Sequence, residues 1–429
     1  MTDTVLLKKK IKKLFSTGFF HIIGGNVINK IIGFLSGIIL VRILSKTEYG
    51  SFTYAWNIYS IVLLFNGMGI DSSVLQLSSE HGGDLDFTKG LTSFATKFGL
   101  LFNTLLSIVL VGIGLFAPLK IQSGRPILCA LCLLPMVQFI SNMISCNLRA
   151  QKRNREYARV AVTNTIVLLL VSAGSAFFIR EMGLVLGHYV SNICTCLLGV
   201  LFFRVKLLSN KHIDLDKDKS DLLKIGFITM VNNGLSQLLY LLDVFVLGIV
   251  DPQETILASY KVATMIPAAL TFIPLSVVIY LYPYFAEHKD DRRWCLTRYK
   301  QILLVMGGFN LAVSLVLFSF APIIIKLVFG KQYLDAVLVF RILSLNYFIS
   351  GTFRILSGNL LVTQRKLKFN LLVAVVSSLI NAFADYFFIQ WWGSMGAALA
   401  TVSVVLVSSI MSTTYLVITF KKIKKEPTK

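Results

Sequence analysis

Long stretches of this sequence lack charged side chains, and that absence restricts the class of protein first. Only 15% of the 429 residues are Asp, Glu, Lys or Arg, whereas soluble domains carry about 25%. Stretches without any charge occupy residues 98–119, 126–148, 160–179, 182–203, 262–286 and 301–325. A bilayer core of about 30 Å needs about 20 helical residues to cross it. The sequence therefore predicts a multi-pass membrane protein, with no room for a separate soluble domain.

The same pattern predicts an all-α fold with about 12 membrane-spanning helices. We expect them at residues 14–41, 52–78, 92–118, 126–148, 158–179, 183–203, 225–249, 256–285, 301–326, 334–362, 369–390 and 394–420. Hydrophobic runs locate membrane-spanning helices well, but they place the helix ends only to within several residues.

Cysteine is scarce, and its pattern does not indicate a metal site. Cys129 and Cys132 have the spacing of half a zinc site, but no second pair and no nearby His accompanies them. We interpret the six cysteines as small apolar packing residues. A Walker A sequence is also missing, so we expect no direct use of ATP and no cofactor.

The positive charges lie in clusters, and their positions explain a net charge of +21. Basic residues gather in the first 13 residues, at 149–159, at 204–224, at 289–300, at 365–368 and in the carboxyl-terminal tail. Each internal cluster follows an even number of predicted helices, so the positive-inside rule predicts that both termini are cytoplasmic. Trp391 and Trp392 are expected at the outer interface. We expect contacts with membrane lipids and no nucleic-acid partner, because the basic residues lie in loops without a basic and aromatic binding surface.

Short segments recur in the same order in both halves of the chain. The pairs are Gly18-Phe19 with Gly226-Phe227, Gly50-Ser51-Phe52 with Ala258-Ser259-Tyr260, Ala150-Gln151-Lys152 with Thr363-Gln364-Arg365, and Met182-Gly183-Leu184 with Met395-Gly396-Ala397. Six predicted helices in each half imply parallel repeats related by an axis along the membrane normal. We expect a six-helix lobe at 1–206, a cytoplasmic linker at 207–224 and a second six-helix lobe at 225–429.

Two predicted helices that occupy equivalent positions in the halves carry polar stripes. On the first helix the stripe consists of Asn26, Lys30, Gly33 and Gly37, and on the seventh of Asn232, Ser236, Tyr240 and Asp243, widened by Asn233 and Gln237. Their spacing places each set on one helical face. Polar groups cannot face lipid unsatisfied, so the stripes either line a cavity between two lobes or make hydrogen bonds between helices. The symmetry of the two stripes favours the cavity.

Several charged residues lie well inside predicted helices. Lys30 and Arg354 are deep, Lys261, Arg341 and Asp243 lie nearer the outer side, and Asp385 is one turn beyond Asn381. A lone charge at the centre of the bilayer costs at least about 2.5–3.5 kcal/mol, so the set indicates a hydrated pathway. Arg341 and Lys261 could instead extend to the outer interface. Central cations beside amides and tyrosines suit an anionic, hydroxyl-rich solute.

The sequence also resembles a known family. The motifs are Asn29-Lys30-Ile31-Ile32-Gly33-Phe34, Arg42-Ile43-Leu44, Glu48-Tyr49-Gly50, Asp243 with Leu247-Gly248, Tyr260 with Pro267, Leu281-Tyr282-Pro283, Phe329-Gly330-Lys331 with Arg341-Ile342-Leu343, and Gly393 with Gly396-Ala397-Ala398. Together they resemble polysaccharide-biosynthesis exporters, the O-antigen flippase branch of the multidrug/oligosaccharidyl-lipid/polysaccharide (MOP) superfamily. This resemblance implies a V-shaped, two-lobed transporter of the bacterial inner membrane, which is not an enzyme.

What the resemblance implies about function is specific. Such a flippase moves an undecaprenyl-pyrophosphate-linked O-antigen or capsular repeat unit from the cytoplasmic to the periplasmic leaflet, for lipopolysaccharide or other surface polysaccharide biosynthesis. Its cationic cavity corresponds here to Lys30, Arg341 and Arg354. The polysaccharide polymerase and the chain-length regulator are the implied protein partners. Lipid II flippases of the superfamily carry a further basic and acidic pair where this chain has Ser36 and Gly37, which disfavours a lipid II substrate.

The site expected from the sequence therefore has two parts. The substrate-binding residues are Lys30, Arg354, Arg341, Lys261, Asn26, Asn232, Asn233, Gln237 and Tyr240, and Asp243 and Asp385 are proposed to couple transport to protons or sodium. A multidrug antiporter of the same fold is one alternative, although it should prefer an acidic cavity. A membrane polysaccharide polymerase or ligase is another, although those enzymes normally have a long periplasmic loop, and no predicted outer loop here exceeds about 12 residues.

Overall fold

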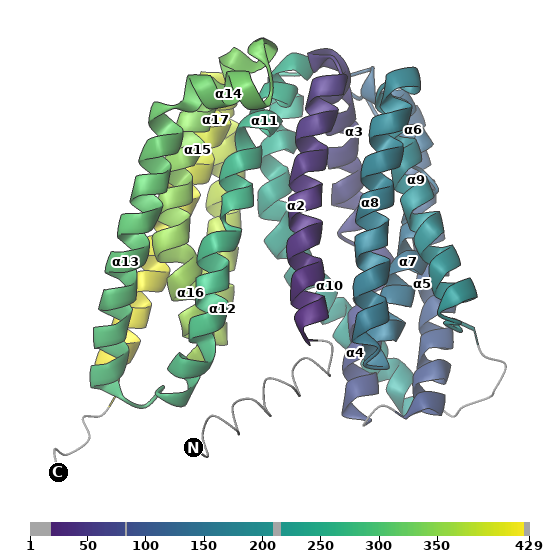
Figure 1. Ribbon diagram of the computed structural model, residues 1–429, viewed down its shortest axis with the longest axis horizontal. Coiled ribbons are helices and arrows are strands. Elements are labelled where there is room, and N and C mark those ends of the chain that lie inside the picture. The colour runs from purple at the N-terminus through teal and green to yellow at the C-terminus, as the bar shows by residue number, and fades with distance from the viewer. Residues whose placement is uncertain (1–18, 82–83, 209–215, 424–429) are drawn as a thin grey trace. The chain divides into compact units, whose positions relative to one another are not determined.

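A computed structural model describes residues 19–81, 84–208 and 216–423 of the chain (Figure 1). Every regular element in these ranges is a helix. Seven helices are long and apolar enough to cross a membrane, and ten spans result if each of three bent helix pairs is counted as one. The predicted all-α membrane fold is thereby confirmed.

In the first part of the chain, two predicted spans are each broken into shorter helices. The helices are α2 (Phe19–Ile43), α3 (Lys46–Leu63), η1 (Asn66–Gly69), α4 (Ile70–Glu80), α5 (Leu85–Phe116), α6 (Gly124–Ala130), α7 (Leu134–Ala150), α8 (Asn154–Ile179), α9 (Glu181–Leu197) and the π-turn η2 (Leu198–Phe202). The span formed by α3 and η1–α4 bends by 41°, and the span formed by α6 and α7 bends by 48°. Gly67 and Gly69 have positive φ at the first bend, a conformation that glycine adopts without steric cost.

The second part of the chain begins with a longer helix than the hydrophobic run predicts. Its helices are α10 (Asp216–Val250), α11 (Glu254–Leu270), α12 (Phe272–Glu287), α13 (Arg292–Ser319), α14 (Ala321–Val328), η3 (Lys331–Ala336), α15 (Val337–Ile349), the π-turn η4 (Ser350–Arg354), α16 (Ile355–Thr363) and α17 (Leu367–Lys422). Helix α17 contains two predicted spans, because Gly393 (φ 54°, ψ −132°) interrupts it between them.

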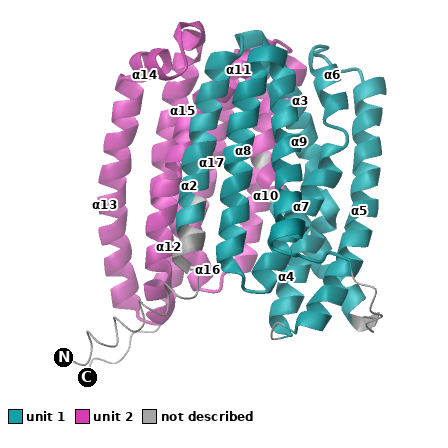
Figure 2. Ribbon diagram, turned by 45° about the vertical axis from the view of Figure 1, so that its right-hand side comes forward, with its two compact units in different colours: residues 1–234 teal, residues 235–429 magenta. Residues whose placement is uncertain are grey.

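The chain divides into two compact units, Met1–Gly234 and Leu235–Lys429, which Figure 2 shows in different colours. The division therefore falls inside α10. Residues 209–215 of the predicted linker lie outside the described residues, and Asp216 already begins α10. The lobes at 1–206 and 225–429 and the linker at 207–224 stay predictions.

Matching backbone conformations occur at the positions that the sequence pairs. Arg180 (φ 52°, ψ −128°) separates α8 from α9, and Gly393, with nearly the same angles, stands at the equivalent break in α17. Lys152 and Arg365, which the sequence also pairs, have φ of 58° and 56°. Positive φ is uncommon for residues other than glycine, so its recurrence at paired positions supports an internal repeat.

A glycine follows the break at Arg180 and another follows the break at Gly393, and at both points two helices approach closely. A Cβ atom on Gly183 would overlap the backbone of Ala176, and one on Gly396 would overlap the carbonyl of Phe388. In both places the helix after the break therefore packs directly on the helix before it.

We expect Gly396→Ala to destabilise the protein by about 1–3 kcal/mol, because the backbone of Phe388 must move to admit the methyl group. The matched control is Gly358→Ala in α16, where the added Cβ meets no atom within 4 Å. That control should be neutral or slightly stabilising, since alanine is the better helix former. Thermal unfolding of both purified variants checks this, and equal unfolding temperatures would contradict it.

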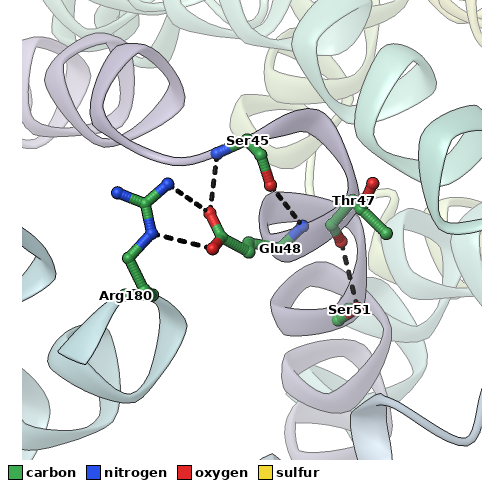
Figure 3. Close-up of polar contacts among 5 residues, drawn as sticks. All are labelled: Ser45, Thr47, Glu48, Ser51 and Arg180. Carbon is green, nitrogen blue, oxygen red and sulfur yellow. Dashed lines mark hydrogen bonds and ion pairs between the residues drawn. The ribbon is translucent and has the colours of Figure 1, made fainter.

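The start of α3 is held to the connection between α8 and α9 (Figure 3). Ser45 Oγ accepts a hydrogen bond from the Glu48 backbone N–H, and Glu48 Oε2 accepts one from the Ser45 N–H at 2.8 Å, which forms a capping box. Arg180 donates to both oxygens of Glu48 at 2.8 Å. The cap explains why α3 begins at Lys46, well before the predicted residue 52.

Candidate functional site

A cluster of polar side chains lies buried inside the second unit, centred on Asp243 of α10. Asp243 Oδ2 accepts hydrogen bonds from Tyr260 OH of α11 at 2.6 Å and from Thr401 Oγ1 of α17 at 2.7 Å. Asn381 Nδ2 of α17 donates to Asp243 Oδ1 at 3.4 Å and to Asp385 Oδ2 at 3.0 Å. The structure thus brings together the two carboxylates that the sequence assigned to ion coupling.

The break in α17 makes this arrangement possible. Asn381 and Asp385 are one turn apart and therefore share a helical face before the break. Thr401 lies after Gly393, yet it contacts the same carboxylate as Asn381. The chain must fold back at Gly393 for both residues to reach Asp243.

The two carboxylates are shielded from solvent. Asp243 is 8% exposed and Asp385 is fully buried. Asp385 Oδ1 and Asn381 Oδ1 are buried acceptors without a hydrogen-bond partner in the described part of the chain. Two ionised carboxylates so placed would carry a large desolvation penalty without a compensating positive charge. The donor set of carboxylate, amide and hydroxyl oxygens fits either a proton or a small hard cation.

The predicted stripe on α10 is divided in the structure. Asn232, Asn233, Gln237 and Tyr240 are exposed, and Tyr240 reaches 74% exposure. Asp243 is buried by contrast, because it turns toward α11 and α17 and takes hydrogen bonds from them. The expectation that Asp243 continues the cavity-facing stripe is therefore wrong, and its place is in the interior of the second unit.

The four predicted cations occupy different surroundings. Lys30 of α2 and Lys261 of α11 have exposed side chains, and Arg354 is half-buried at the end of η4. Arg341 Nε donates to the backbone carbonyl of Phe318 at 3.1 Å, and the Arg341 guanidinium lies 5.3 Å from the centre of the Phe318 ring. Arg341 therefore donates to a carbonyl of the last turn of α13. Asn26 lies in α2, but its side chain is outside the described residues.

Sequence reasoning missed part of the buried cluster. Thr401 gave no distinct signal, because it is one of many serines and threonines in a hydrophobic segment and such hydroxyls usually bond to their own helix. Tyr260 and Asn381 were noticed for other reasons and were not assigned to the site. The i, i+4 spacing of Asn381 and Asp385 was the one local signal available.

Comparisons with known proteins agree with this architecture. The chain is similar to the lipid II flippase MurJ in an inward closed conformation, with a TM-score of 0.71, 13% identity, and coverage of 94% of this chain and 89% of that one. An inward-facing multidrug resistance MATE family transporter of the MOP superfamily also gives a TM-score of 0.71, with 12% identity and coverage of 92% and 95%. A MOP superfamily transporter from Pyrococcus furiosus gives 0.61, with 14% identity and 97% of both chains covered. No curated protein matches the sequence.

The fold therefore defines a multi-pass membrane protein of the MOP flippase and MATE architecture. Residues 39–338 match the family described as polysaccharide biosynthesis protein. This match covers most of the chain, so the protein belongs to that family.

Proposed function

We propose that this protein is a flippase that moves an undecaprenyl-pyrophosphate-linked O-antigen or capsular repeat unit from the cytoplasmic to the periplasmic leaflet. The observation that carries the proposal is membership of the polysaccharide biosynthesis family in a chain with a transporter fold. Neither the family nor the similar structures indicate an enzyme. A multidrug antiporter shares the fold, but the family match favours a role in polysaccharide biosynthesis.

The solute determines what the protein must supply. A pyrophosphate and several sugars cannot enter hydrocarbon without a large desolvation cost, whereas the polyprenyl chain can stay in lipid. Lys30 and Arg354 would hold the pyrophosphate through charge-assisted hydrogen bonds, with Lys261 and Arg341 as secondary contacts. The exposed amides Asn232, Asn233 and Gln237, together with Asn26 and Tyr240, would bond sugar hydroxyls.

The buried cluster would supply the energy coupling. Binding of a proton or a sodium ion between Asp243 and Asp385 would neutralise one of the two negative charges and so lower the cost of burying the pair in the second unit. An ion that binds one transport state better than another shifts the equilibrium between them. Rocking of the lobes about the substrate would then complete alternating access.

We further infer a topology in the bacterial inner membrane, with both termini in the cytoplasm. Reporter fusions after Ser123, Asp251 and Ser394 should report the periplasm, and fusions after Gln151, Asp218 and Lys424 the cytoplasm. The basis is the distribution of Lys and Arg, which are retained on the cytoplasmic side. Two reversed sites would contradict the topology.

A deletion strain tests the function itself. Loss of the protein should remove surface polysaccharide and cause lipid-linked repeat units to accumulate on the cytoplasmic side. Complementation at matched protein level should restore both. If the deletion instead changes only drug resistance, the antiporter alternative is correct. The polymerase and the chain-length regulator are the partners to seek by cross-linking in the complemented strain.

A further inference from the structure

The first unit contains a polar cavity that the site described above does not use. Its volume is about 550 Å³, and it is partly open. Small-molecule sites have volumes of about 300–1,000 Å³, so the cavity can hold a ligand of that size. All of its lining residues lie between Asn29 and Thr195, within the first unit.

Two helices present polar faces to this cavity. On α7 the lining residues include Gln138, Asn142 and Ser145, and on α9 they are His188, Ser191, Asn192 and Thr195. Their spacings of three, four and seven residues place each set on one side of its helix. On α9, Ser191, Asn192 and Thr195 already donate to backbone carbonyls of their own helix. Asn142 and Ser145 of α7 make no hydrogen bond within the described residues, so these two side chains need a polar partner in the cavity.

The charge of the lining excludes two ligand classes. Only Asp71 and Arg149 carry a full charge among the lining residues, counting His188 as neutral, and their charges are opposite. A pyrophosphate site would need an excess of cations, and a site for cationic drugs an excess of carboxylates. A lining dominated by amides and hydroxyls matches a neutral, hydroxyl-rich ligand.

The cavity is also organised before any ligand binds. Tyr59 OH donates to Gln138 Oε1 at 2.7 Å, and Asn164 Nδ2 donates to Thr195 Oγ1 at 2.9 Å, so two lining amides are fixed. Asn29 Oδ1 is a buried acceptor without a hydrogen-bond partner among the described residues. A bound hydroxyl group would satisfy it.

Flat rings complete the lining. The ring of His188 stacks on Trp56 with centroids 4.1 Å apart. Such stacked rings form a rigid wall with an apolar body and polar edges. The C–H faces of a sugar ring suit that surface, while its hydroxyls suit the amides on α7, α8 and α9.

We propose that this cavity binds a neutral sugar residue of the transported oligosaccharide. The inference rests on the proposed function, which it deepens by giving one sugar of the glycan a site of its own, apart from the pyrophosphate and from the amides of α10. Lys30 and Arg354 would recognise the pyrophosphate, which every substrate of this kind shares. The cavity would recognise the sugar and so contribute to specificity.

Two variants test the cavity with little risk to the fold. Asn142→Leu and Ser145→Val remove polar groups that line it, and neither side chain makes a hydrogen bond within the described residues. The matched control is Asn359→Leu in the second unit, where the Asn359 amide is half-buried and donates only to Ile355 O of its own helix, at 2.8 Å. Thermal unfolding of each purified protein verifies that it is folded.

The assay measures binding of two probes to the full-length protein in lipid nanodiscs. One probe is undecaprenyl pyrophosphate without sugar, and the other is the undecaprenyl-pyrophosphate-linked repeat unit extracted from the host. Both cavity variants should bind the sugar-bearing lipid roughly tenfold more weakly than the wild type, because a buried hydrogen bond to the sugar is lost. They should bind the sugar-free lipid normally, and Asn359→Leu should bind both probes normally.

The outcomes separate the two proposals. If folded Asn142→Leu and Ser145→Val bind the sugar-bearing lipid like the wild type, or lose both probes equally, the cavity is not a sugar site while the flippase proposal stands. If the wild type binds neither probe, the flippase proposal fails, and the sugar site fails with it. If one variant does not fold, the other decides.

Discussion

Replacement of Lys30 by alanine is expected to abolish export of the repeat unit, whereas replacement by arginine should retain part of it. Lys30 is an exposed cation about half-way along α2, a helix that the sequence predicts to span the membrane. Loss of a charge-assisted contact to the pyrophosphate costs roughly 1.5–3 kcal/mol, enough to slow transport about tenfold or more. Arginine keeps the charge but presents it in a planar fork, so partial function is the expected result.

The measurement is the amount of surface polysaccharide in a deletion strain complemented at matched protein level. Accumulated lipid-linked repeat units on the cytoplasmic side provide the companion measurement. Lys97→Ala is the matched control, because Lys97 is also an exposed lysine inside a membrane-spanning helix, α5. Normal polysaccharide with both Lys30→Ala and Lys30→Met would show that Lys30 does not contact the headgroup, and Arg354 would then become the main candidate.

Replacement of Asp385 by asparagine is expected to abolish coupled transport. Asp385 is fully buried, and one of its oxygens has no hydrogen-bond partner in the described part of the chain. Asparagine preserves the size of the side chain and removes the ionisable group. The variant should therefore fold but lose the ion that the pair of carboxylates would bind, with a fall in transport of about tenfold or more.

Proteoliposomes with an imposed sodium or proton gradient provide the test. Wild-type transport should depend on one of the two gradients, and Asp385→Asn should respond to neither. Asp251→Asn serves as the control, since Asp251 lies beyond the end of α10 and outside the buried cluster. An Asp385→Asn variant that responds to the gradient like the wild type would contradict the role of this carboxylate.

The sequence predicted some of the helices well from hydrophobic runs alone. Residues 369–390 and 394–420 were separated correctly, because Gly393 marks the break that the structure contains. The run at 301–326 was less informative. It was predicted as one helix, but α13 ends at Ser319 and a short α14 follows at Ala321, just before Pro322. Both sides of this break are apolar, so hydropathy carries no signal of it.

The site was predicted only in part. Asp243 and Asp385 were found because buried charge is rare in membrane helices, but their partners lie on two helices, α11 and α17, whose contacts with α10 depend on tertiary packing. Asp243 was assigned to the wrong face, since a short polar stripe on a helix does not reveal which neighbour covers each residue. The cavity residues on α7 and α9 had the same spacing signal. Because these amides and hydroxyls carry no charge, nothing in the sequence distinguished them from polar side chains that bond to their own helix, as Thr195 bonds to Ser191 O.

The most direct test of the central claim is translocation by the purified protein. The undecaprenyl-pyrophosphate-linked repeat unit is reconstituted with the protein into liposomes, and its sugars are labelled on the outer leaflet with an impermeant reagent. We predict that the lipid initially in the inner leaflet becomes accessible in proportion to the amount of protein, and that Lys30→Ala removes this transfer. Accessibility equal to that of protein-free liposomes, in the presence of either ion gradient, would contradict the assignment of this protein as a flippase.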